Sequence, residues 1–333
     1  MARLPKSTKH TKTALAIFDA TAEHIDEWRR AHLGASVLGE ECSRRIWYGF
    51  RWAVNPWRVL AAKFKANPDD EKHPGQLFSL FGRGHREEPL LIKRMGWAGI
   101  TIDHWSVDRL RCKPGGHLGG TMDGIGIGFP EAPKTDHVWD SKTANDKQFK
   151  IFRKMGLKRW NAKNYGQAQL YMHWSPDNLR RACYTVLNKN DDDIHSDRVP
   201  YVKAEATALE TKGRQLSVMP EPPERISDDP TWWQCGFCDF HGVCQHGEVE
   251  MLERSCRTCA FVTSNPDGTW TCGKTDERLN VDAQKAGCSM HLFIPKLLPW
   301  DAEAYDEQGG TITYRRRDGS RVIDTGNDLE ARP

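Results

Sequence analysis

Apolar positions along the chain follow two different spacings, which predict helices and strands in a mixed order. Helical spacing predicts helices at about 19–31, within 36–60, and at 76–95 and 161–174. Strand-like runs bounded by Gly- and Pro-containing turns occur at 100–107, 117–129, 137–143, 181–188 and 199–206. Because strands follow and precede helices along the chain, the pattern predicts an α/β fold with a mixed β-sheet flanked by helices.

The sequence changes character after this α/β region. The segment 218–230 is rich in proline and predicts a linker, and a Cys-rich stretch and then a polar stretch follow it. In the last part, the Asp318-Gly319 pair predicts the turn of a hairpin. We expect an N-terminal tail and helix at 1–35, a main domain at 36–245, a small Cys-rich subdomain at 250–300 and a polar tail or hairpin at 301–333.

Large aromatic residues lie among arginines in the segment 36–60. They are Trp47, Tyr48, Phe50 and Trp52. Their positions favour a buried stripe on a helix, and the alternative is an aromatic patch that faces DNA.

Composition places the chain among ordinary globular proteins. Apolar residues make up 38% of the 333 residues, which excludes disorder of the whole chain. The net charge is small, 48 − 45 = +3, so any contact with nucleic acid depends on a local basic surface. No apolar run approaches the roughly 20 residues of a membrane span, and the first residues do not resemble a secretory signal. We therefore expect a cytoplasmic protein, in which clustered cysteines bind metal more often than they form disulfides.

Two carboxylates and a lysine lie on consecutive predicted strands. Asp140 and Lys142 are two residues apart, so they share one face of a strand. If the strands at 117–129 and 137–143 pair as a hairpin, Asp123 approaches the same face, and two carboxylates form a hard oxygen site for Mg²⁺ or Mn²⁺. Such a site suits phosphodiester hydrolysis, whereas a solvated Asp/Lys pair is the ordinary alternative.

The order of these motifs resembles the PD-(D/E)XK nuclease superfamily. Asp123, then Asp140-Ser141-Lys142, then Gln167 and Tyr171 four residues apart on a helix are similar to its RecB-like branch, including iron-sulfur nucleases of CRISPR adaptation and phage exonucleases. The resemblance covers about residues 36–245. Two features depart from the pattern, since Asp140 stands where Glu is more usual and the first motif lacks a literal Pro-Asp pair.

The resemblance implies a metal-dependent DNA exonuclease with a PD-(D/E)XK core and a role in phage or bacterial recombination, replication or repair. It also implies a further ligand of the metal on the helix at 76–95, for which Glu88 and His85 are the candidates. The implied catalytic set is Glu88, His85, Asp123, Asp140, Lys142, Gln167 and Tyr171. Within this set Glu88, Asp123 and Asp140 hold the metal, Lys142 assists the attacking water, and the Gln and Tyr orient DNA or the site.

A first group of cysteines has C-x2-C-x5-C spacing, which leaves a four-ligand site short by one. Its members are Cys235, Cys238 and Cys244. The sequence around Cys42 resembles the N-terminal Cys of the iron-sulfur relatives, which implies a 4Fe-4S cluster held by all four thiolates. The alternatives are zinc on the same thiolates, zinc with His241 or His246 in place of Cys42, and Cys42 as an ordinary thiol.

A second group of cysteines follows. Cys256 and Cys259 form a C-x-x-C pair, and Cys272 and Cys288 lie downstream, with His291 three residues further on. The spacing resembles a small zinc ribbon and predicts a structural zinc site, whose fourth ligand is Cys288 or His291.

Other readings of the sequence remain open. They are a non-catalytic nucleic-acid-binding metalloprotein and a structure-specific endonuclease with the same site. DNA is the expected partner, with a single-strand annealing or single-strand binding protein as a second, and no membrane; the oligomeric state is not predicted. Basic residues at 147–159 either contact phosphates or form a solvated helix face.

Overall fold

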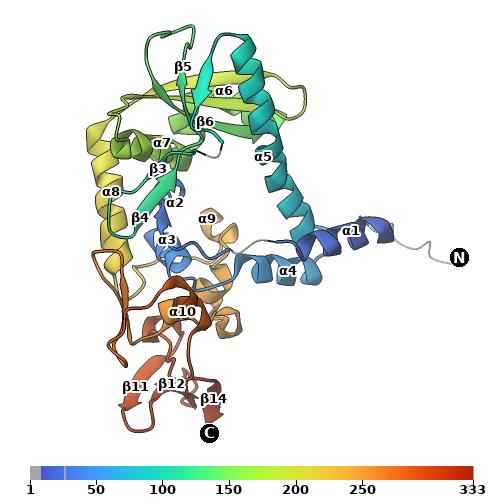
Figure 1. The fold of residues 1–333 in the computed structure, drawn as a ribbon. Coiled ribbons are helices and arrows are strands. Elements are labelled where there is room, and N and C mark those ends of the chain that lie inside the picture. The colour runs from blue at the N-terminus through green and yellow to red at the C-terminus, as the bar shows by residue number, and fades with distance from the viewer. Residues whose placement is uncertain (1–8, 26–27, 107, 333) are drawn as a thin grey trace, which may run out of the picture.

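The structure is a computed structural model that describes residues 9–25, 28–106 and 108–332. It is a mixed α/β structure, with a five-stranded sheet at one end and a Cys-rich part and second sheet at the other (Figure 1). The α-helices are α1 Lys12–Ala22, α2 Ala35–Leu38, α3 Ser43–Phe50, α4 Pro56–Ala66, α5 Pro74–Trp97, α6 Asp146–Trp160, α7 Ala162–Trp174, α8 Lys203–Val218, α9 Trp233–Gly236 and α10 Val281–Ala286. Shorter helical turns are η1 Gly242–His246, η2 Val249–Met251, η3 Cys256–Thr258 and η4 Pro295–Leu297.

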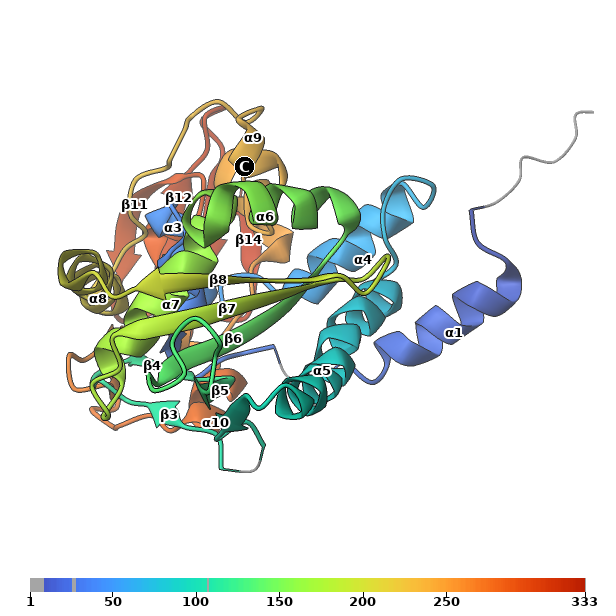
Figure 2. The same ribbon diagram turned by 90° about the horizontal axis from the view of Figure 1, so that it is seen from above.

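The strands form separate sheets. They are β1 Leu33–Gly34, β2 Thr101–Asp103, β3 Arg111–Cys112, β4 Leu118–Thr121, β5 Gly124–Ile127, β6 His137–Ala144, β7 Arg181–Asn188, β8 Ile194–Pro200, β9 Val262–Ser264, β10 Trp270–Cys272, β11 Asp301–Asp306, β12 Thr311–Arg315, β13 Arg321–Asp324 and β14 Leu329–Arg332. The five-stranded sheet has the order β2-β5-β6-β7-β8, and β6 and β7 are its parallel pair (Figure 2). The sheet is therefore mixed, as the pattern predicts.

Strand β6 is the central strand, and helices pack on both of its faces. Trp139 lies in one apolar cluster with Leu91 and Met95 of α5. Its neighbour Val138 lies in another cluster with Leu170 of α7. Since successive side chains of a strand point to opposite faces, Asp140 and Lys142 share the face of Val138, on the side of α7.

The second end of the molecule has its own core. There β11 to β14 form a four-stranded antiparallel sheet, and Ile312, Tyr314 and Val322 of that sheet pack in one cluster with Trp47 and Tyr48 of α3. The predicted turn at Asp318-Gly319 connects β12 and β13. Other residues of α3, Ile46 and Phe50, lie in the cluster that contains Val138 and Leu170, so α3 contacts both cores.

The aromatic residues of the segment 36–60 are packed inside the protein. Trp47, Tyr48, Phe50 and Trp52 are all buried. The predicted buried stripe is confirmed, and the alternative of an aromatic patch facing DNA is wrong, because these four side chains are 3% exposed or less.

Three predicted elements differ from the structure. The strand predicted at 199–206 is wrong beyond Pro200, where β8 ends, and α8 begins at Lys203. The segment after Pro200 consists mainly of strong helix formers, and proline lacks the N–H that would extend the ladder. The helix predicted at 19–31 lies instead at 12–22, where Thr11 caps it by accepting a hydrogen bond from the Ala14 N–H, and residues 26 and 27 lie outside the described part.

The predicted strand at 117–129 is divided into β4 and β5, which belong to different sheets. Strand β4 pairs with β1 and β3, whereas β5 pairs with β2 and β6. The break between them contains Asp123. In the described part of the chain, no helix is long and apolar enough to cross a membrane.

A buried histidine joins the two ends of the molecule. The ring of His117, which precedes β4, contacts the rings of Phe50 and Trp270 at centroid distances of 5.2 and 5.3 Å. Its Nε2 lies 2.8 Å from the Ser264 Oγ. Burial, and then the charge of Arg257, lowers the pKa of His117 to about 4, so the folded protein keeps this ring neutral.

We predict that this histidine makes the fold sensitive to mild acid. An unfolded histidine titrates near 6.5, so the unfolded chain takes up the proton first as pH falls, and stability is lost between about pH 6.5 and 4. From pH 7 to 5 the loss from this ring is up to about 2 kcal/mol. Chemical denaturation at both pH values should show a smaller loss in His117→Gln, and an equal loss in both proteins would contradict the prediction.

Candidate active site

The β5–β6 hairpin brings the predicted acidic residues together. Gly124 pairs with Trp139, which places the preceding Asp123 beside Asp140. The Lys142 Nζ lies 2.6 Å from the Asp140 Oδ1 and 3.5 Å from the Asp123 Oδ2. It also donates to the Ser141 carbonyl at 3.0 Å. The hairpin and the shared face of Asp140 and Lys142 are as the sequence predicts.

Glu88 joins this group from α5. Its carboxylate forms a short contact with the guanidinium of Arg109, and a second nitrogen of Arg109 lies 3.9 Å from the Asp123 Oδ1. Glu88 is buried, whereas His85, one turn earlier on the same helix, is exposed. Of the two candidates on α5, Glu88 is the one connected to Asp123, through Arg109.

Arg109 is a site residue that sequence reasoning missed. It lies in the loop between β2 and β3, where it has no motif and no spacing relation to the other residues. The only available signal was the excess of carboxylates, because the buried acids Glu88 and Asp140, with the half-buried Asp123 beside them, require cationic partners.

Electrostatics raise the pKa of two of these acids. Burial, and then the neighbouring charges of Asp123 and Glu88 acting against that of Lys142, raises the pKa of Asp140 to about 7. Burial, and then the charge of Asp123, also raises the pKa of Glu88. The charges of Asp140 and Asp123 outweigh burial and raise the pKa of Lys142, which stays an ammonium. The cations Lys142 and Arg109 thus lie against the three carboxylates of the site.

The carboxylates fit a divalent cation. The Asp140 Oδ2 is buried and has no hydrogen-bond partner, although buried polar atoms are normally paired. Within residues 9–25, 28–106 and 108–332, no three His, Cys, Asp or Glu side chains already surround a metal position. The side chains of Lys142 and Arg109 lie between the acids instead. An unpaired buried oxygen and three mutually repelling carboxylates are the donor set that Mg²⁺ or Mn²⁺ prefers.

Helix α7 places Gln167 and Tyr171 beside the segment that precedes Asp123. The Tyr171 hydroxyl donates to the Thr121 carbonyl at 2.8 Å, two residues before Asp123. The Gln167 amide donates to the same hydroxyl at 3.3 Å. A Cβ on Gly120 would lie 2.6 Å from the Tyr171 ring, so this close approach requires glycine. Tyr171 therefore positions the turn that carries Asp123.

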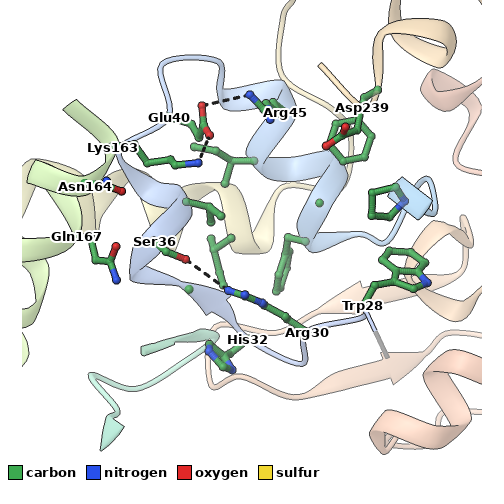
Figure 3. A pocket seen from close by; sticks show the side chains of 18 of the residues that line it. Trp28, Arg30, His32, Ser36, Glu40, Arg45, Lys163, Asn164, Gln167 and Asp239 are labelled. Carbon is green, nitrogen blue, oxygen red and sulfur yellow. Dashed lines mark hydrogen bonds and ion pairs between the residues drawn. The ribbon is translucent and has the colours of Figure 1, made fainter. Parts of the chain in front are cut away.

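Two cavities meet at Lys142. The larger has a volume of about 700 Å³ and is lined by residues of α7, α3 and the segment 28–40, with Gln167 and Tyr171 among them. Figure 3 shows Glu40 in this cavity between Lys163 and Arg45, at 2.9 and 3.5 Å. The smaller cavity, of about 290 Å³, lies against α5, and its lining residues include His85, Glu88, Arg109, Asp123 and Lys142. The lysine is therefore accessible from two sides.

The basic residues at 147–159 lie on α6, and half of the six cations are paired with carboxylates. Lys150 pairs with Asp146 at 2.8 Å, Lys158 with Glu205 at 2.7 Å, and Arg153 with Asp193. This pairing favours the solvated helix face over a phosphate-binding role.

The first cysteine group lies at one place in the fold. Cys42 caps the N-terminus of α3, and the Gln234 amide, one residue before Cys235, donates to the Glu41 carboxylate at 2.7 Å. The Arg44 Nη1 lies 3.9 Å from the Cys244 Sγ. The structure thus brings the distant Cys42 to the 235–244 segment, and its role as a ligand stays a prediction.

The second cysteine group lies around η3 and the β9–β10 hairpin. Burial, and then the charge of Cys259, raises the pKa of Cys256 to about 11. Both ring nitrogens of His291 are already engaged, with Arg254 at 3.2 Å and Thr258 at 3.1 Å. Cys288 is therefore the better placed of the two candidates for a fourth ligand, and metal binding here also stays a prediction.

Comparison with known proteins gives weak similarities. No protein-family model and no curated protein matches the chain. Among solved structures, the crystal structure of SSO0001 has 14% identity over 70% of this chain and 96% of that one, with a TM-score of 0.39. An alkaline exonuclease (LHK-Exo) from Laribacter hongkongensis has 14% identity over 61% and 90%, with a TM-score of 0.38. The complex of LHK-Exo with dAMP has 13% identity over the same shares, with a TM-score of 0.37.

We predict that a divalent cation binds at these carboxylates and stabilises the fold. At about 100 times its dissociation constant, Mn²⁺ should raise the free energy of unfolding by about 2.7 kcal/mol, measured by chemical denaturation. Asp123→Asn removes one ligand and should abolish this gain. Asp69→Asn, in an exposed turn, is the matched control and should retain it. An equal gain in wild type and Asp123→Asn would show that the cation binds at another site and would contradict the prediction.

Proposed function

We propose that the chain is a metal-dependent deoxyribonuclease that acts as an exonuclease on DNA ends. One observation carries the proposal. The Lys142 ammonium contacts Asp123 and Asp140 and lines both cavities, beside a buried carboxylate oxygen without a partner. A lysine held only to neutralise two acids would not need access from two sides.

The residues present suit phosphodiester hydrolysis. Glu88, Asp123 and Asp140 would hold the cation, which would polarise the phosphoryl oxygen and lower the pKa of water. Lys142 keeps its proton, so it acts as a hydrogen-bond donor and positive charge toward the attacking water and the developing negative charge. Tyr171, with its pKa raised to about 12 chiefly by burial, stays neutral and keeps the Asp123 turn in place.

The larger cavity supplies groups for the substrate strand. Its lining includes Arg30, Arg45 and Lys163, which can meet phosphates, and Trp28, which can stack on a base (Figure 3). Glu40 holds Lys163 and Arg45 in place before substrate arrives. The resemblance to RecB-like nucleases supports action at DNA ends, in phage or bacterial recombination, replication or repair, with a single-strand annealing or binding protein as a partner. It also supports a cytoplasmic site of action.

The cysteine groups are proposed as structural metal sites. Cys42, Cys235, Cys238 and Cys244 would hold a 4Fe-4S cluster that ties α3 to the segment after the linker. Cys256, Cys259, Cys272 and Cys288 would hold zinc. The thiols of both groups are free, so none is consumed by a disulfide.

Purification without oxygen tests the proposed 4Fe-4S cluster. We expect a brown protein that contains about four iron atoms and one zinc per chain by elemental analysis. The group with Cys42 resembles iron-sulfur nucleases, whereas the group with Cys256 has the spacing of a zinc ribbon. Cys42→Ser should lose the iron and keep the zinc. A colourless protein that contains only zinc would overturn the iron-sulfur assignment.

Digestion of DNA tests the activity. End-labelled linear duplex and a covalently closed circle are incubated with Mg²⁺ or with EDTA, and wild type is compared with Lys142→Ala. We expect Mg²⁺-dependent loss of the linear DNA only, reduced at least about 100-fold by the substitution, because the ammonium stabilises charge that develops during reaction. Lys203→Ala, an exposed lysine at the start of α8, is the control and should retain activity.

The other outcomes distinguish the alternatives. Cleavage of the circle that depends on Lys142 would identify an endonuclease with the same site. If a folded, metal-loaded protein cuts neither DNA, the enzyme proposal is overturned in favour of a non-catalytic nucleic-acid-binding protein.

A further inference from the structure

A second basic cavity lies away from the carboxylates, between α3 and the C-terminal sheet. Its volume is about 510 Å³. It is lined by five cationic side chains and one carboxylate, which are Arg44, Arg225, Lys296, Arg316, Arg317 and Asp318. The whole chain carries a net charge of only +3, so this cavity holds a strong local excess of positive charge.

Carboxylates of the described residues neutralise little of this excess, and the Cys244 thiol, which also lines the cavity, lies 3.9 Å from the Arg44 Nη1. The Asp318 carboxylate accepts hydrogen bonds from the N–H and the hydroxyl of Ser320, and so serves the β12–β13 turn. Arg225 lies 3.6 Å from Asp228, whose side chain is 92% exposed, and an exposed pair of this kind contributes little. Within the described residues, neither Lys296 nor Arg317 forms an ion pair, and both are exposed.

Two further cations are held against aromatic rings. The Arg44 guanidinium lies 5.7 Å from the centroid of the Tyr48 ring and donates to the Pro223 carbonyl at 2.6 Å. The Arg316 guanidinium lies 5.1 Å from the centroid of the Trp300 ring. A cation–π contact holds a guanidinium beside the ring and leaves its positive charge in place, so both groups can contact an anion.

Helix α3 separates this cavity from the larger active-site cavity. Arg44 and Tyr48, four residues apart, line the basic cavity, whereas Arg45 and Gly49 line the cavity that contains Lys142. Residues four apart share a face of a helix, so the two cavities lie on different faces of the same two turns. The neighbouring residues Arg44 and Arg45 therefore carry positive charge into the two cavities from the same turn of α3.

We propose that the basic cavity binds the phosphate backbone of the substrate DNA strand, several nucleotides from the bond that is cut. This inference rests on the proposed function and deepens it, since it assigns the C-terminal sheet a role in substrate binding. Contacts of Lys296, Arg316 and Arg317 with phosphates are independent of base sequence, as an exonuclease requires.

The test measures binding of fluorescent single-stranded oligonucleotides by anisotropy, in a Lys142→Ala background so that no DNA is cut. One oligonucleotide fills only the active-site cavity, and a longer one also reaches past α3. We expect Lys296→Gln with Arg317→Gln to weaken binding of the long oligonucleotide roughly tenfold and leave the short one unchanged. The slope of log affinity against log salt should fall by about 1.4, or about 0.7 for each lost phosphate contact.

The controls separate this inference from the proposed function. Lys134→Gln with Lys203→Gln removes two exposed lysines outside the cavities described above and should change neither affinity nor slope. Unchanged long-strand affinity in the Lys296/Arg317 variant would overturn the inference, while Mg²⁺-dependent digestion by wild type would still support the nuclease. Loss of long-strand affinity in a protein that never digests DNA would support the cavity and overturn the nuclease.

A small anion is the remaining occupant to exclude. If inorganic phosphate alone raises the melting temperature of wild type as much as the long oligonucleotide does, and the double variant loses both effects, the cavity binds free phosphate and the inference is overturned.

Discussion

The burial of the Asp140 carboxylate is the constraint on which the site depends. A charged group on the central strand of a sheet loses its hydration, and only nearby cations or a metal compensate for that loss. Asp140 is 4% exposed, and it has Asp123 and Glu88 as neighbours, which add to the cost. Lys142 and Arg109 offset part of it, and one oxygen of Asp140 stays without a partner. Buried carboxylates with strongly perturbed pKa values are typical of functional sites.

The scaffold holds these charges at fixed positions. The β5–β6 register sets Asp123 beside Asp140, and the apolar packing of Trp139 against α5 brings Glu88 to the same place. On the other face, Tyr171 fixes the turn before Asp123 by its hydrogen bond to Thr121. The site is therefore built from two strands and two helices that pack against one sheet, which gives it more rigidity than a site on loops.

The sequence predicts the parts of this site that depend on local geometry. The period of two places Asp140 and Lys142 on one face, and the four-residue spacing does the same for Gln167 and Tyr171. Arg109 could not be predicted, because its contact with Glu88 depends on the path of a loop. The misread segment after Pro200 shows the same limit, since Val199 and Tyr201 suggest a strand, whereas the packing of α8 decides the structure. The proximity of Cys42 to the segment 235–244 was expected from a three-thiol motif that lacks a ligand and from the resemblance of the sequence around Cys42, since the spacing alone cannot indicate so distant a contact.

A crystal structure with Mn²⁺ and a short oligonucleotide, with the anomalous signal of the metal recorded, tests the central claim most directly. The charge arrangement predicts a manganese ion in contact with the Asp140 Oδ2 and with Asp123, with Arg109 moved away from Glu88 and a phosphate beside Lys142. An intact contact between Arg109 and Glu88, with no anomalous signal among the three carboxylates at saturating Mn²⁺, would contradict the claim that these residues form a metal-dependent hydrolytic site.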